Sequence, residues 1–190
     1  MTSFEYISTL LSIIIGLGIT HLLIGIGRII NNPKGVKTYW IHLVWTLTIF
    51  IWLISYWWFE YRLISIQEWT FQLYLFFILY AISLFFLCII NMPFYFPDEF
   101  REYYYSTRKW FFIVLLLVSI IDITDTIVKG SSHFANMGIE YQIFISTCGI
   151  LAIVGFFSKK ELHHAIIAIF FCLYNIWYTI TELNKLPTDL

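Results

Sequence analysis

Charged residues are scarce in this chain. Only 12% of its 190 residues are Asp, Glu, Lys or Arg, whereas 60% are hydrophobic and 21% are aromatic. Soluble domains are roughly one quarter charged, so the composition excludes an ordinary soluble domain and predicts an integral membrane protein surrounded by lipid. The formal net charge of -1 and the lack of a basic tail argue against direct binding of nucleic acid.

Cysteines and catalytic motifs are also few. The three cysteines, Cys88, Cys148 and Cys172, lie in apolar stretches without CxxC spacing, which favours small apolar packing residues over ligands. No HExxH, GxSxG or GxxxxGK[ST] motif occurs. His163 and His164 are adjacent and diverge by about 100° on a helix, so they do not chelate together. We therefore expect no enzymatic activity, no cofactor and no metal site.

Prolines are absent from the long apolar runs, which argues against the broken helices of many secondary transporters. These runs predict one all-α domain, 1–190, a polytopic transmembrane helical bundle of about six spans. We expect the first run to be retained, because it is too long for a secretory signal and lacks a basic head. The expected spans are 7–29, 39–59, 69–91, 110–128, 139–157 and 165–181.

The segment between the third and fourth spans holds much of the charge of the chain. Two arrangements fit Pro93 to Trp110: a short interfacial or cytoplasmic helix, or an extension of the fourth span. Its charged residues form a candidate surface for a cytoplasmic protein effector. They are Asp98, Glu99, Arg101, Glu102 and Arg108.

Lysines and arginines are distributed unevenly among the loops. The first, third and fifth loops carry eight of them, and the rest of the chain carries three. The positive-inside rule therefore places these three loops in the cytoplasm and both termini outside, as in a multi-pass protein of the bacterial inner membrane. The eight are Arg28, Lys34, Lys37, Arg101, Arg108, Lys109, Lys159 and Lys160.

Glycines mark the first span on two sides. At a helical period Gly16 and Gly27 share one side with Thr9 and Thr20, whereas Gly18 and Gly25 lie on nearly the opposite side. Small residues let membrane helices approach closely, so this span is expected to pack between neighbours from its own chain or from another copy, in a homo-oligomer. The alternative is that glycines are simply common in membrane helices.

Three ionisable residues within the spans are candidates for a pore or cavity. Asp122 and Asp125 lie one turn apart, and could form an acidic lining that attracts cations. The alternative is a structural pair of Asp125 with Lys129 at a helix end. His21 is a proton relay, a metal ligand or, as we favour, a neutral imidazole bonded to a neighbouring helix. His42 has the same standing.

Three stretches resemble a group of small uncharacterised bacterial multi-spanning membrane proteins: Phe4 to Leu23, Tyr39 to Trp58 and Asp98 to Phe112. The size and layout more loosely resemble membrane accessory proteins of phage-defence loci, including those of type VI-B CRISPR systems. That resemblance implies a membrane pore or sensor that modulates a cytoplasmic nuclease.

Three hypotheses follow for the function. The first is a self-associating pore, channel or membrane sensor, acting as an accessory in anti-phage defence. The second is a small transporter or lipid-handling protein with a site near Asp122 and His21. The third is a structural subunit of a larger membrane complex.

Overall fold

The computed structural model describes residues 3–66, 68–128 and 138–183, and these ranges contain six α-helices and no β-strand. A 3-10 helix, η1 (Glu60–Ser65), directly follows the second α-helix. The prediction of an all-α fold is therefore confirmed. The helices are α1 (Ser3–Asn31), α2 (Trp40–Phe59), α3 (Phe71–Asn91), α4 (Phe100–Val128), α6 (Gly138–Phe157) and α7 (Glu161–Leu183).

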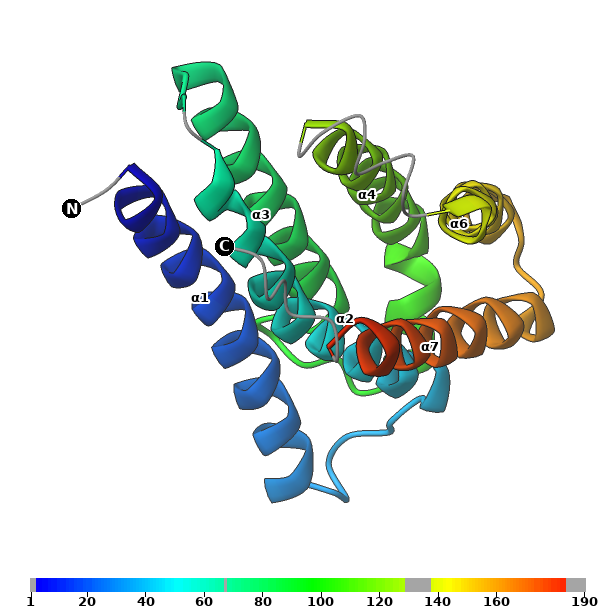
Figure 1. The fold of residues 1–190 in the computed structure, drawn as a ribbon. Coiled ribbons are helices and arrows are strands. Elements are labelled where there is room, and N and C mark those ends of the chain that lie inside the picture. The colour runs from blue at the N-terminus through cyan, green and yellow to red at the C-terminus, as the bar shows by residue number, and fades with distance from the viewer. Residues whose placement is uncertain (1–2, 67, 129–137, 184–190) are drawn as a thin grey trace.

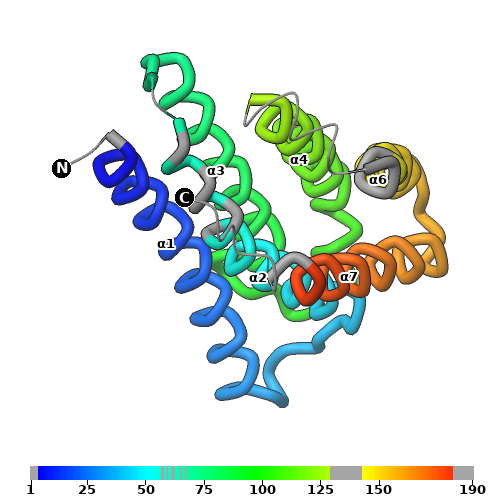
Figure 2. The backbone as a smooth tube through the Cα atoms, in the orientation of Figure 1, coloured from blue at the N-terminus to red at the C-terminus, as the bar shows by residue number. Residues whose placement is uncertain are grey.

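The helices fan out around a shared core (Figure 1). α1 and α3 run side by side, α4 packs against α3, and α6 packs against α4. α2 contacts α1, α3 and α7. Figure 2 shows α6 almost end-on in the view in which α1 and α3 lie lengthwise, so the six described helix axes do not share one direction.

Aromatic side chains fill the centre of the bundle. Trp45 of α2 is fully buried, and its ring lies 4.8 Å from that of Phe111 on α4 and 5.3 Å from that of Phe171 on α7. Aromatic pairs at such separations add to the burial of their large apolar surfaces. This cluster joins α2, α4 and α7 at the core.

Four helices are long and apolar enough to cross a membrane: α1, α3, α4 and α7. The apolar stretches found in α2 and α6, Trp40–Tyr56 and Ile143–Phe157, are shorter. Large apolar side chains such as Leu17, Leu79 and Ile120 are about half exposed on the outside of the bundle. Such an outer surface suits contact with lipid, and these helices are compatible with an integral membrane protein.

The charged segment after α3 adopts one of the two arrangements that the sequence left open. Residues 92–99 are not helical, and from Phe100 the chain forms α4 without a break to Val128. Pro93 and Pro97 keep the preceding residues out of a helix. The segment from Phe100 to Trp110 is thus an extension of the fourth predicted span.

The two glycine sides of α1 meet different surroundings. A Cβ atom at Gly25 would collide with the Met92 side chain, and one at Gly18 would lie 3.3 Å from Cys88 Sγ. This side therefore packs closely against α3, as the small residues predict. At Gly16 and Gly27 a Cβ atom would have nothing within 4 Å, so that side faces away from the described part of the chain.

Candidate functional site

The three basic loops meet at one end of the bundle, which we call the basic end. Lys37 bonds through its backbone to Asp98 and Phe100, and its Nζ lies 3.8 Å from Glu99 Oε2. These contacts join the first loop to the third. Arg108 Nε of α4 donates to Ser158 O at 3.2 Å, which brings the turn between α6 and α7 to the same end.

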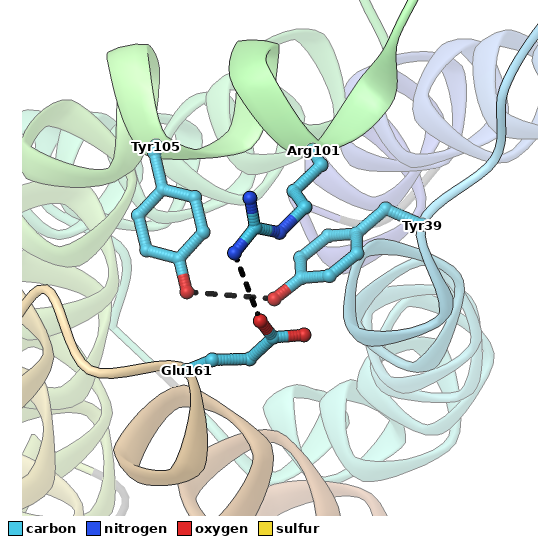
Figure 3. A network of polar contacts seen from close by, with 4 residues as sticks. All are labelled: Tyr39, Arg101, Tyr105 and Glu161. Atoms are coloured by element: carbon cyan, nitrogen blue, oxygen red, sulfur yellow. Dashed lines mark hydrogen bonds and ion pairs between the residues drawn. The ribbon is translucent and has the colours of Figure 1, made fainter.

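A polar network at this end ties α4 and α7 to the residue before α2 (Figure 3). Arg101 Nη2 donates to Glu161 Oε2 at 3.0 Å, and the hydroxyls of Tyr39 and Tyr105 lie 3.5 Å apart. The Arg101 guanidinium also lies over the Tyr105 ring, at 5.7 Å. Because both charged partners are substantially exposed, we assign the ion pair an orienting role more than a large share of the stability.

The C-terminal end of α3 is capped by side chains from three other helices. The last carbonyls of a helix have no partner within it, and Pro93 stops α3 from continuing. His21 Nε2 of α1 donates to Met92 O at 2.6 Å, and His42 Nε2 of α2 donates to Asn91 O. The Tyr103 hydroxyl of α4 donates to Ile90 O at 2.8 Å.

The hydrogen bond of His21 to Met92 O, at the end of α3, agrees with the interpretation favoured from the sequence, a bond to a neighbouring helix. His42 forms the same kind of bond, as the sequence also favoured, whereas the role of Tyr103 was missed, because its partner is a backbone carbonyl of another helix. A histidine in an apolar run opposite a proline-terminated helix is a signal that could have suggested such a cap.

Some of the residues expected to face a partner instead form contacts within the chain. Glu99 lies beside Lys37, and Arg101 is paired with Glu161. Arg108 is only 8% exposed, and its guanidinium donates to the carbonyls of Ser158 and Tyr105. Asp98 and Glu102 remain exposed and available to a partner.

Asp122 and Asp125 face other helices of the same chain. The Tyr80 hydroxyl of α3 donates to Asp122 Oδ1 at 2.7 Å, and Asp125 is only 6% exposed. The Tyr56 ring of α2 contacts the Tyr80 ring edge-on at 5.1 Å. Glu60 is also buried and lies within electrostatic range of Tyr56, as does Asp125.

We call these five residues the carboxylate cluster: Tyr56, Glu60, Tyr80, Asp122 and Asp125. The sequence identified the two aspartates, whereas the contact of Asp122 with Tyr80 joins residues 42 positions apart. A tyrosine hydroxyl in the middle of an apolar run was the signal available for it. Lys129, the structural partner considered for Asp125, lies outside the described residues.

The two aspartates of the cluster lie in the last two turns of α4. Trp110 is 67% exposed, as expected for an aromatic side chain at the boundary of the hydrocarbon core. Asp122 follows twelve residues later, which is about 18 Å along a helix, against a hydrocarbon core about 30 Å thick. In a membrane with its boundary at Trp110, a carboxylate at this position would need a donor, and the Tyr80 hydroxyl supplies one.

The chemistry open to the cluster is that of protons and weakly held cations. The Asp122 carboxylate can take up and release a proton, while the Tyr80 hydroxyl keeps its own proton and donates a hydrogen bond to the charged carboxylate. Within the described residues, no three His, Cys, Asp or Glu side chains are grouped so that they could hold a metal ion.

Comparison of the chain with known protein families, with characterised proteins and with solved structures finds no match.

Proposed function

We propose that this chain is a membrane protein that senses or conducts a cation, most simply a proton, through the carboxylate cluster. The observation that carries the proposal is the position of Asp122, bonded to Tyr80 between α3 and α4, with Asp125 buried one turn further on. Ionisable groups at membrane depth are costly, and they commonly mark ion pathways and proton relays.

The inward position of Asp125 favours a path within one protomer. A ring of carboxylates around a shared pore would need these side chains on the outer surface of the bundle. Self-association remains part of the proposal, with the Gly16 and Gly27 side of α1 as the contact between copies, because small residues there leave the backbone accessible.

We also propose a multi-pass location in the bacterial inner membrane, with the basic end in the cytoplasm. The meeting of the three basic loops at one end supports this orientation. α1 runs toward that end and α7 runs away from it, so both termini would lie outside.

Ion flux tests the proposal directly. In proteoliposomes that contain a pH-sensitive dye, the parent protein should admit protons when a potassium diffusion potential is applied. The double variant Asp122→Asn, Asp125→Asn should lower that rate at least tenfold while its insertion is unchanged. Glu102→Gln, which removes an exposed carboxylate from the same helix, is the control and should keep the parent rate.

Two results would count against a cation path. One is an unchanged flux in the aspartate variant. The other is a failure of that variant to insert or fold, which would assign the two aspartates a structural role.

A second candidate is an accessory protein that engages a cytoplasmic effector, such as a defence nuclease, through the segment before α4. Tyr95 is 92% exposed, and Asp98 and Glu102 are exposed nearby in the sequence. Replacing these three residues by alanine should abolish co-purification of the effector at an equal membrane level. Co-purification that is unaffected by the change would exclude this surface.

A further inference from the structure

Three exposed lysines lie on neighbouring segments at one corner of the basic end, where Arg108 of α4 bonds to the turn between α6 and α7. Lys109 Nζ lies 5.6 Å from the centroid of the Phe156 ring, near the end of α6. Lys159 and Lys160 follow in the turn itself. We call Lys109, Lys159 and Lys160 the lysine corner.

Hydrogen bonds fix the backbone of the turn that carries two of these lysines. Ser158 O accepts hydrogen bonds from Arg108 Nε at 3.2 Å and from His164 Nε2 at 3.1 Å. The Lys160 backbone N–H donates to Ser158 Oγ at 3.1 Å. The backbone of the turn is therefore ordered before a ligand binds, which lowers the entropic cost of binding.

The positive charge of the corner is not balanced by the described carboxylates. At the basic end, Lys37 pairs with Glu99 and Arg101 pairs with Glu161, and neither pair includes a lysine of the corner. The adjacent Glu161 is thus already occupied by Arg101. In addition, α7 begins at Glu161, so the positive end of its dipole lies beside the corner.

Two exposed aromatic side chains are close to lysines of the corner in the sequence. Trp110 follows Lys109 directly, and Phe157, at the end of α6, is 75% exposed. Aromatic rings with this exposure on a membrane protein are typical of the interface between hydrocarbon and headgroups.

The geometry points to the lysine corner as a binding surface for the phosphate of an anionic phospholipid headgroup. Three ammonium groups on a fixed frame complement one or two phosphates, while Trp110 and Phe157 lie beside the acyl chains. Basic sites between helices on the cytoplasmic side of a membrane bind such headgroups. The inference needs only that the chain lies in a membrane, and it is independent of the carboxylate cluster.

Native mass spectrometry of the full chain in detergent tests this inference, with phosphatidylglycerol and phosphatidylcholine as probes. The parent should retain phosphatidylglycerol in preference to phosphatidylcholine. The triple variant Lys109→Gln, Lys159→Gln, Lys160→Gln should weaken that binding by about fivefold per lysine. Lys34→Gln, which removes a basic charge elsewhere at the same end, should change it less than about twofold.

The charge-retaining variant with arginine at all three positions should bind phosphatidylglycerol like the parent. If the triple glutamine variant fails to fold, the single variants Lys159→Gln and Lys160→Gln in the exposed turn decide, and each should weaken the binding by about fivefold. Equal retention of the two lipids by the parent, or equal losses in the triple variant and Lys34→Gln, would overturn the inference. Displacement by millimolar inorganic phosphate would overturn it too, since it would indicate a soluble phosphate ligand.

Discussion

Two adjacent residues, Arg108 and Lys109, carry the same charge in opposite surroundings. Arg108 is buried, and its guanidinium donates to the carbonyl of Ser158 just after the end of α6. The negative end of that helix favours a cation at this point. Lys109 is exposed, with its ammonium over the Phe156 ring.

This difference predicts unequal costs for two matched substitutions. Arg108→Met should lower the free energy of unfolding by about 2 kcal/mol, because Ser158 O would lose a charged donor in a buried place. Lys109→Met should change it by less than about 0.5 kcal/mol, as is usual at exposed positions. Denaturation in detergent without anionic lipid measures both, and equal effects would contradict the assigned cap.

The position of Asp122 could be predicted from the sequence, but its partner could not. An aspartate in an apolar run stands out by composition alone. The Tyr80 hydroxyl that bonds to it comes from another helix, 42 residues away, and depends on how α3 and α4 rotate against each other. The burial of Arg108 could not be predicted either, because it depends on the position of α6 and not on the residues around Arg108 in the sequence.

At the scale of elements, α1 has one side packed in its own chain and one side turned outward. Periodicity predicted the two glycine sides, because a helix places residues seven apart on nearly one line. Which side meets α3 depends on the path of the loop 32–39, and the sequence pattern left this open. The structure resolves it, with Gly18 and Gly25 toward α3.

Leucine at the two pairs of glycines should therefore have different effects. Gly18→Leu with Gly25→Leu should destabilise the monomer by at least about 2 kcal/mol, because the added side chains overpack the contact with Cys88 and Met92. Gly16→Leu with Gly27→Leu should leave the monomer intact and reduce self-association. Thermal unfolding and the oligomer mass in detergent separate the two effects.

The reverse pattern would contradict this assignment of the sides of α1. A monomer that tolerates leucine at Gly18 and Gly25 would show that the approach of α1 to α3 is not tight.

In the described part of the molecule, the basic loops and the buried carboxylates Glu60 and Asp125 lie in different places. The basic end gathers three loops, whereas buried carboxylates lie toward the end where α4 finishes, together with η1. The sequence predicted which loops are basic, and the structure brings them into contact. It could not predict the fanned arrangement of the helices, because that arrangement follows from ring packing around Trp45 and not from hydrophobic runs.

Sided labelling of single cysteines tests the membrane orientation most directly. The native cysteines are buried, so they give a low background. In intact spheroplasts, a membrane-impermeant maleimide should label Glu68→Cys, which lies in the loop before α3. It should label Lys34→Cys and Lys159→Cys only after permeabilisation. Labelling of the two basic-end cysteines from outside, or equal labelling of all three before permeabilisation, would contradict a chain embedded with its basic end in the cytoplasm.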